Sequence, residues 1–306
     1  MKPIRKIYLT GLGAVGGAYG SKLYEMDPRC IKIIADSQRI GRYLKNGIII
    51  NESTYPFEYI RPEETADPAD LVIVAVKQHH LEQVIKDIRN FINSDTIILS
   101  LLNGITSEEI LGKEYGMDRM LYSFCVGTDS VREGTKIHFS SIGKIVFGEK
   151  TNYTVTSKVT AVKELFEAAK IPYSIPENMI RELWWKFMVN VGINQISAIL
   201  RAPYGVFQNV KEAKELMDSA SREVIELSVK AGINLCEDDI LTFTRILHTL
   251  SPDGKTSMLQ DIEAGRKTEV EIFAGAVIEL GCKYGIATPV NKMLFNMIST
   301  LEQMNL

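Results

Sequence analysis

The 306-residue sequence lacks the features of a membrane, disulfide-bonded or nucleic-acid-binding protein. No apolar run is long enough to span a membrane, and the first one, at residues 7–10, is too short for a signal-peptide core. Acidic and basic residues are interspersed and leave a formal charge of -3, which disfavours a basic surface for nucleic acid or anionic lipid. These absences point to a small-molecule partner.

Cysteine pairs and metal-ligand patterns are also missing. The four cysteines lie far apart with no C-x-x-C pair, which argues against a structural zinc site or a disulfide framework: Cys30, Cys125, Cys236 and Cys282. His138 and His248 have no neighbouring ligand pattern, so no metal site is expected. Unpaired thiols and the lack of an export signal lead us to expect a cytoplasmic protein.

What the sequence contains is an alternation typical of α/β proteins. Apolar residues make up 45% of the sequence and charged residues 24%, and there is no low-complexity stretch, which is typical of a globular protein. The length of the chain favours two domains. Strand-like runs at residues 6–10, 31–35, 71–76, 96–102 and 120–126 alternate with helix-like stretches, which predicts a parallel sheet covered by helices. A strand at 144–148, a helix at 155–169 and a strand at 171–175 follow.

From residue 177 to the end the periodicity is almost entirely helical, with breaks near Pro203, Gly232, Pro252 and Pro289. We therefore place the domain boundary near residue 175. The expected fold class is an α/β Rossmann-like domain at 1–175 followed by an all-α domain at 176–306.

A glycine-rich turn follows the first strand and opens a helix. It has the G-x-G-x-x-G spacing, formed by Gly11, Leu12, Gly13, Ala14, Val15 and Gly16. In a dinucleotide site the first glycine allows the turn, the second lets the backbone approach the pyrophosphate, and the third packs helix on strand. Asp36 ends the second strand 20 residues beyond Gly16, where an acidic residue binds ribose. The alternative is a flexible glycine turn without function.

One helix of the second domain carries a polar stripe. Lys186, Asn190 and Asn194 recur every four residues, so they share one face of an otherwise apolar helix. Asparagine disfavours helix interiors, and an unpaired buried amide is costly. A lysine beside aromatic neighbours can have its pKa lowered and can protonate a developing alkoxide. The alternative is that the amides pair within the core while the lysine reaches solvent.

A second polar segment, residues 256–269, interrupts the later helices. Ser257 can bond a carboxylate, and Glu269 can orient an ammonium group or accept from a hydroxyl. Helix capping explains the same residues about equally well.

Taken together, the motifs of the whole chain resemble the ketopantoate reductase family. They are the glycine turn, Lys77 after a strand, Asn103-Gly104, the Trp184-x-Lys186-x3-Asn190-x3-Asn194 helix, Ser257-Met258-Leu259-Gln260-Asp261, Thr268-Glu269 and Gly285-Ile286-Ala287-Thr288-Pro289. The resemblance implies reduction of 2-dehydropantoate to pantoate with NADPH, in the biosynthesis of pantothenate.

The resemblance also implies a role for each matching residue. Lys186 would be the general acid, Asn190 and Asn194 would hold the substrate hydroxyl, Ser257 would meet its carboxylate, and Glu269 would position lysine and substrate. Asn103 would lie beside substrate and nicotinamide ribose, and Lys77 would contact the cofactor. Two departures concern the substrate: Leu102 replaces a polar residue of many members, and Gly254 replaces an asparagine of some.

The cofactor evidence is divided. Asp36 favours NAD because it accepts ribose hydrogen bonds and repels a 2′-phosphate, whereas the family resemblance implies NADPH. Arg39, with Ser37, can fold over the pocket and clamp the phosphate, or Arg39 and Arg42 are ordinary solvated residues. We expect NADP, with NAD as the alternative.

The sequence leaves open the substrate, the class of function and the oligomeric state. Another small 2-keto acid could be the substrate, and a dinucleotide-binding sensor without turnover is a different class of function. A proton donor poised in the cleft speaks against the sensor. The late helices, such as residues 269–284, could equally pack on the core or on a second subunit of a homodimer.

Overall fold

The computed structural model describes residues 2–304. The chain forms two compact units, residues 1–180 and 181–306, and each is described by itself. The division falls near the start of helix α6 (Met179–Leu200), whereas the sequence placed the boundary near residue 175.

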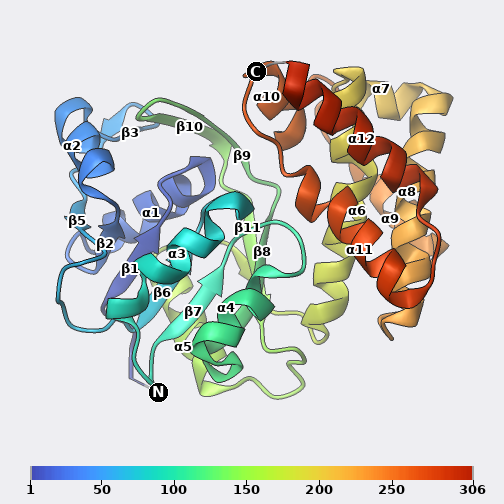
Figure 1. Ribbon diagram of the computed structural model, residues 1–306. Helices are drawn as coiled ribbons and strands as arrows, with labels where there is room; N and C mark the ends of the chain where they lie inside the picture. The colour runs from blue at the N-terminus through green and yellow to red at the C-terminus, as the bar shows by residue number, and fades with distance from the viewer. Residues whose placement is uncertain (1, 305–306) are drawn as a thin grey trace. The chain divides into compact units, whose positions relative to one another are not determined.

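The first unit is built on a mixed eight-stranded sheet (Figure 1). Its strand order is β12-β11-β8-β7-β6-β1-β2-β5, and the run from β8 to β5 is parallel. β11 is antiparallel to β8. The strands are β1 (Ile7–Thr10), β2 (Ile31–Ile34), β5 (Glu58–Ile60), β6 (Leu71–Val74), β7 (Ile97–Ser100), β8 (Met120–Val126), β11 (Lys144–Gly148) and β12 (Tyr173–Ser174).

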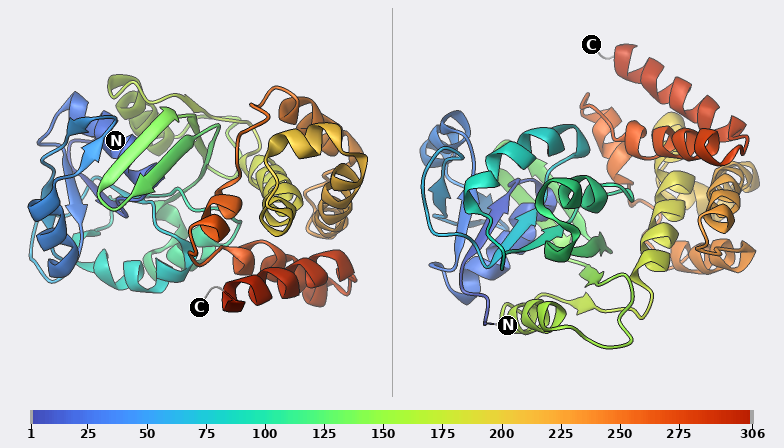
Figure 2. Two further views of the ribbon diagram at one scale, coloured as in Figure 1. Left: turned by 90° about the horizontal axis from the view of Figure 1, so that it is seen from above. Right: turned by 60° about the horizontal axis from the view of Figure 1, so that its bottom comes forward.

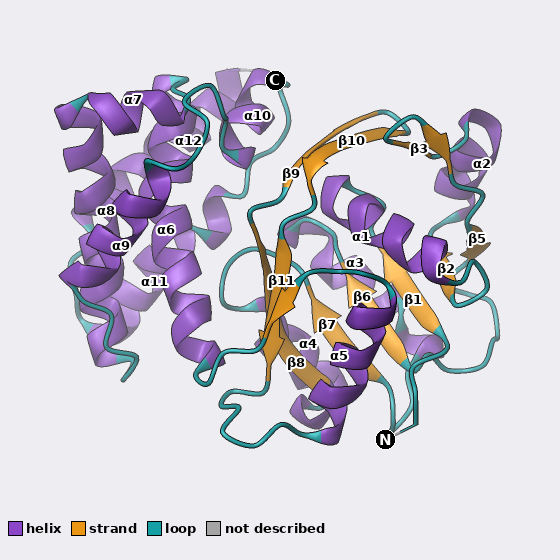
Figure 3. Cartoon of the chain, turned by 180° about the vertical axis from the view of Figure 1, so that it is seen from behind, coloured by secondary structure: helices purple, strands orange, loops and turns teal. Residues whose placement is uncertain are grey.

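Helices cover both faces of this sheet. Apolar residues of α1 (Ala14–Met26), α2 (Ser37–Asn46) and α5 (Ser157–Ala168) join one core, and those of α3 (Leu81–Asp87) and α4 (Ser107–Tyr115) join the other. Figure 1 shows α3 and α4 in front of the sheet, and Figure 3 shows α1 and α5 from behind. Continuous apolar strands such as β6, buried at all four positions, suit this double cover.

Short 3-10 turns complete the connections between these elements. They are η1 (Gln78–His80), η2 (Arg89–Phe91) and η3 (Met117–Arg119).

A second, four-stranded sheet has the order β4-β3-β10-β9. Its strands are β3 (Ile49–Ile50), β4 (Ser53–Thr54), β9 (Asp129–Glu133) and β10 (Lys136–Ser141). The green β9–β10 hairpin is nearest the viewer in the left view of Figure 2. Ile137 of β10 packs on α1 at Gly17, where an added Cβ would lie 2.2 Å from the Ile137 side chain. The sequence did not predict this sheet.

The second unit is helical, as its periodicity predicted. Its elements are α6, α7 (Tyr204–Asn209), α8 (Lys211–Lys230), α9 (Glu237–Leu247), α10 (Ser257–Glu263), η4 (Val270–Ile272), α11 (Ala274–Tyr284) and α12 (Pro289–Met304). α6 and α8 approach closely at Gly192, where a Cβ would lie 2.3 Å from the Ser221 hydroxyl. The predicted helix at 269–284 is instead two elements, divided at Phe273 (φ -103°, ψ -91°). The fold class predicted from the sequence is confirmed.

Candidate active site and cofactor site

The glycine turn has the local geometry of a dinucleotide cradle. Gly11 has φ +96°, and a Cβ there would lie 2.5 Å from the Ala75 carbonyl oxygen. A Cβ at Gly16 would lie 1.9 Å from the Gly11 carbonyl oxygen, so helix and turn touch. At Gly13 an added Cβ would meet only the Ala75 oxygen, at 3.9 Å. Gly13 thus leaves the backbone open to a ligand.

The first turn of α1 offers hydrogen-bond donors at this opening. The Gly17 N–H is bonded to the Gly13 carbonyl at 2.9 Å, which closes the first helical turn. The N–H groups of Ala14, Val15 and Gly16 precede that bond and have no partner within a regular helix, which suits a phosphate. Leu12 is 2% exposed in the core, so its contribution to a cofactor is limited to its backbone.

The other cofactor residues follow neighbouring strands. Asp36 follows β2, the glycine turn β1, Lys77 β6 and Asn103 β7, and these four strands are adjacent in the sheet. All four are parallel, so their carboxyl ends share one edge, which is where open α/β sheets bind ligands. The structure therefore brings the predicted residues of the first unit to one edge.

Asp36 and Arg39 form a local pair at this edge. Asp36 caps α2, since its Oδ1 accepts the Arg39 N–H at 2.7 Å. Its Oδ2 lies 3.4 Å from the Arg39 Nε; Asp36 is exposed and Arg39 is half-buried. Arg39 is therefore close to Asp36, as the phosphate-clamp hypothesis requires, while Arg42 lies over the Tyr43 ring at 5.8 Å.

His80, which the sequence analysis left out of the site, lies near two of these residues. Its pKa is lowered, first by burial and then by the charges of Arg39 and Lys77. Arg39 of α2 and Lys77 after β6 therefore lie close enough to His80 for their charges to act on it. The signal in the sequence was the position of His79 and His80 soon after Lys77 at the end of a strand, but such histidines are more often simply solvated.

The loop from residue 101 to 106 carries Asn103, which is half-buried. Gly104 has φ +90°, a conformation that favours glycine, so the turn after Asn103 depends on that residue. Leu102, one of the two departures from the family pattern, is 4% exposed and belongs to the hydrophobic core.

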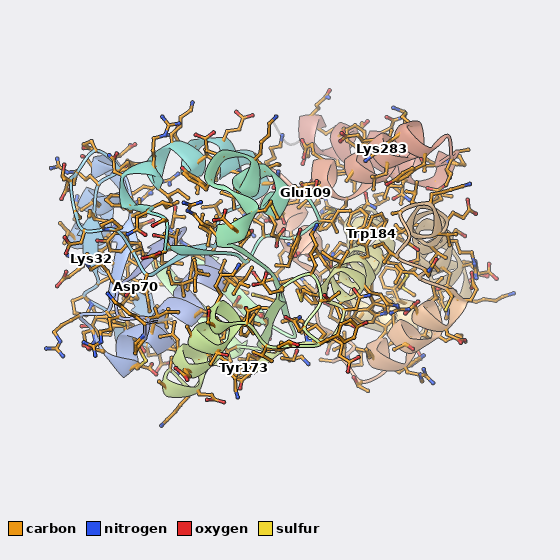
Figure 4. All side chains as sticks on the ribbon, turned by 90° about the horizontal axis from the view of Figure 1, so that it is seen from below. Lys32, Asp70, Glu109, Tyr173, Trp184 and Lys283 are labelled. Carbon is orange, nitrogen blue, oxygen red and sulfur yellow. The ribbon has the colours of Figure 1, made fainter. Side chains whose placement is uncertain are left out.

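In the second unit the three stripe residues lie on α6. Asn190 and Asn194 are 5% and 6% exposed, and Lys186 is half-buried beside Phe187, whose ring packs edge-on against Trp184 at 6.1 Å. Figure 4 labels Trp184 on this helix. The buried amides and the adjacent ammonium group make this face of α6 polar within an apolar core.

Ser257 is tied to the same helix by its neighbour Thr256. Thr256 caps α10, accepting the Leu259 N–H at 3.2 Å, and its hydroxyl donates to Ser197 of α6 at 3.1 Å. Ser197 lies three residues after Asn194 and is therefore on its face of the helix. Ser257, in the first turn of α10, is exposed and can bind an anion.

Glu269 lies at the start of η4, directly after the polar loop that follows α10. Its neighbour Thr268 is 1% exposed and bonded to Glu302 of α12. The second departure from the family pattern, Gly254, has a steric reason. A Cβ at this position would lie 2.9 Å from the Tyr204 ring. An asparagine at that position would require the ring to move.

Comparison with known proteins identifies the family. Residues 7–152 match the family model described as "Ketopantoate reductase PanE/ApbA", and residues 178–302 match "Ketopantoate reductase PanE/ApbA C terminal". The chain belongs to the ketopantoate reductase family. It is therefore an oxidoreductase of that family, as the resemblance predicted.

Related sequences and solved structures match this chain over nearly its full length. A 2-dehydropantoate 2-reductase from Aquifex aeolicus is 25% identical over 309 residues, covering 99% of each chain. D-mandelate dehydrogenase with NADH and anilino(oxo)acetate superposes with TM-score 0.87 at 22% identity, covering 98% of this chain and 99% of the other. A dimeric ketopantoate reductase from Staphylococcus aureus gives TM-score 0.82 at 20% identity with the same coverage.

Metal-ligand clusters and membrane-spanning helices are both absent from residues 2–304. No group of His, Cys, Asp and Glu side chains is arranged to hold a metal ion there. Among the described helices, none is long and apolar enough to cross a membrane.

Proposed function

We propose that this chain reduces 2-dehydropantoate to pantoate with NADPH. The observation that carries the proposal is the α6 stripe, in which Lys186 lies on the same face as two buried asparagines and α10 is tied to that face through Thr256 and Ser197. The family membership supports a reductase, and the full-length similarity to 2-dehydropantoate 2-reductases supports this substrate.

Each residue has a defined task in the proposed reaction. Bound nicotinamide supplies a hydride to the 2-keto carbon. Lys186 donates a proton to the carbonyl oxygen, and Asn190 and Asn194 hold that oxygen as it becomes a hydroxyl. Ser257 binds the substrate carboxylate, and Glu269 orients Lys186 and substrate.

The residues of the first unit fit a dinucleotide. Open approach at Gly13 and the N–H groups of the first turn of α1 suit the pyrophosphate. Asp36, Ser37, Arg39 and Lys77 would hold the adenosine end, and Asn103 the nicotinamide ribose. The preference for NADPH rests on Arg39, whose guanidinium partly offsets Asp36 and matches phosphate oxygens bidentately.

Reduction of a different small 2-keto acid is the second candidate. It is favoured by Gly254, which lacks the asparagine of some family members and packs on Tyr204. The similarity to D-mandelate dehydrogenase, a solved neighbour with a different named substrate, points the same way.

A substrate screen distinguishes the two candidates. Purified protein would be assayed with ketopantoate, pyruvate and 2-ketoisovalerate, with oxidation of NADPH followed by absorbance. We expect the highest kcat/KM with ketopantoate. A higher kcat/KM with another acid would refute ketopantoate as the preferred substrate but not the reductase activity. No turnover with any of the acids would refute both assignments.

We also propose that the protein is a homodimer, as one solved relative is described to be. Met293 and Met297 of α12 are 49% and 42% exposed and could take part in a contact. Light scattering after size exclusion would give the mass, and a monomer at assay concentration would refute the dimer.

A further inference from the structure

A carboxyl group is fully buried beside the loop that carries Asn103. Glu108, in the first turn of α4, is 1% exposed, although its neighbour Glu109, labelled in Figure 4, is exposed. Three serines around it are also buried: Ser100, Ser107 and Ser123. Burying a charge or a carboxyl is costly unless it is hydrogen-bonded, so this cluster needs a physical explanation.

Glu108 joins three elements through hydrogen bonds. Its Oε2 accepts from the Ser107 hydroxyl at 2.9 Å, and its Oε1 accepts from the Ser123 N–H of β8 at 3.2 Å. The Ser107 hydroxyl also lies 2.7 Å from that of Ser100, the last residue of β7. Ser123 in turn donates its hydroxyl proton to the Ser100 carbonyl. One carboxyl therefore fixes α4 against the end of β7 and the middle of β8.

The hydrogen bond that Ser107 donates to Glu108 also gives the chain of hydroxyls a direction. Each serine has a single hydroxyl proton. Because Ser107 donates its proton to Glu108, Ser100 must donate to Ser107, and the Ser100 oxygen is left to accept. It accepts the N–H of Leu102 at 3.4 Å. The chain of donors thus runs from Leu102 through Ser100 and Ser107 to Glu108.

Leu102 is the residue immediately before Asn103. Its side chain is held in the core and its N–H is held by Ser100, so the backbone entering Asn103 is fixed from two sides. On the other side of the loop, Ser107 begins α4. Both ends of the 101–106 loop are therefore connected to Glu108 through serine hydroxyls. Fully satisfied buried networks of this kind rigidify the segments they join.

We propose that Glu108 is a positioning residue for Asn103. Through Ser107 and Ser100 it fixes the loop that places the Asn103 amide against substrate and nicotinamide ribose. This inference rests on the proposed function, in which Asn103 has that role. Glu108 itself is buried and takes no part in proton or hydride transfer.

The test is a double-mutant cycle in the full-length protein with Glu108→Gln and Asn103→Ala. Glutamine keeps the size of the side chain but replaces one of the two acceptor oxygens by an NH2 donor, so it cannot keep both the Ser107 bond at Oε2 and the Ser123 bond at Oε1. We expect Glu108→Gln to lower kcat/KM for the keto acid by roughly 10-fold or more, as small misplacements at a site do. In the Asn103→Ala background the same substitution should have almost no further effect, since sites that act together are not additive.

Two control measurements and one substitute variant make the result decisive. The Kd of NADPH in the absence of keto acid should change less than kcat/KM does, because the glycine turn is outside the network and only the ribose contact of Asn103 is disturbed. Glu109→Gln, the exposed neighbour on the same helix, should leave kcat/KM unchanged. If Glu108→Gln does not fold, Ser107→Ala breaks the same chain and replaces it in the cycle.

The outcomes separate the inference from the proposed function. Full additivity of the two substitutions, or native kcat/KM in folded Glu108→Gln, would overturn the positioning role. If Asn103→Ala alone leaves kcat/KM unchanged, the role of Asn103 in the proposed function fails and the positioning inference fails with it. A large effect of Asn103→Ala with an additive Glu108→Gln refutes the positioning inference alone.

Discussion

Glu302 accepts two hydrogen bonds from Thr268 with a single carboxylate oxygen. The Thr268 N–H lies 2.7 Å and the Thr268 hydroxyl 2.6 Å from Oε1. The Thr268 hydroxyl oxygen also accepts the Val270 N–H at 3.3 Å, at the start of η4. The last turn of α12 is thereby bonded to the backbone on both sides of Glu269. Stability of this segment depends on a residue near the end of the chain.

Glu302→Ala should lower the stability of the second unit. It would leave the Thr268 N–H, in a residue that is 1% exposed, without its partner, and an unsatisfied buried donor costs about 1–3 kcal/mol. Both tryptophans of the chain lie on α6, so urea unfolding followed by tryptophan fluorescence reports on this unit. Gln303→Ala, an exposed neighbour, is the control. Equal midpoints for Glu302→Ala and the control would contradict the prediction.

Glu108 should make stability depend on pH in a defined direction. Burial raises its pKa from 4.5 to about 7, despite hydrogen bonds from Ser123 and Ser107 that favour the charged form. Between pH 4.5 and 7 the folded state therefore binds more protons than the unfolded state. The stabilising contribution is present below pH 4.5, is lost as the pH rises, and levels off above 7, with a total of up to about 3 kcal/mol.

Circular dichroism during urea unfolding of native protein and Glu108→Gln would isolate this effect. The other titratable groups contribute to both proteins, so the difference in unfolding free energy between the two should decrease from pH 5 to pH 8. Glu109→Gln, at an exposed site, should show no such trend against the native protein. A pH-independent difference for Glu108→Gln would show that the carboxyl does not titrate in this range.

The sequence predicted the elements with strong apolar patterns. β6 was expected at residues 71–76 because a continuous apolar run suits a strand that is buried on both faces, and in the structure the strand spans Leu71–Val74. The second sheet was missed because its strands are short and, apart from the two isoleucines of β3, mostly polar. In β10 the side chain of Ile137 alone is fully buried, so the pattern differs little from that of a loop.

Site residues could be predicted where a sequence motif alone assigns them a role. In the glycine turn, the G-x-G-x-x-G spacing assigns each glycine to a position where a side chain would clash or would block the cofactor. Glu108 does not, because a glutamate in the first turn of a helix normally interacts with the helix dipole in solvent. Its burial depends on Ser100 and Ser123, from strands that the fold alone brings to α4. The proximity of His80 to Arg39 likewise arises from the order of strands in the sheet.

Lys186→Ala should abolish most of the turnover. Removing a general acid costs on the order of 10²-fold or more in kcat, while the Kd of NADPH should hardly change because the cofactor cradle is in the first unit. Circular dichroism would verify that the variant is folded. Near-native kcat in a folded Lys186→Ala protein would exclude this lysine as the proton donor.

Arg39→Ala should remove the preference for NADPH. In the native protein the Arg39 Nε lies 3.4 Å from Asp36, and its charge helps to lower the pKa of His80, so a phosphate placed there would meet a positive local field. Without the guanidinium, Asp36 remains to repel the 2′-phosphate and to bind the ribose hydroxyls of NADH. We therefore expect kcat/KM with NADPH to fall by about 10-fold or more, the typical value of a charge-assisted phosphate contact, while kcat/KM with NADH is maintained or rises. Arg42→Ala is the matched control, because the Arg42 guanidinium lies over the Tyr43 ring and should not contribute to the preference. A native preference for NADH, or an NADPH preference that Arg39→Ala leaves intact, would refute the phosphate clamp and leave Asp36 as the determinant of the cofactor.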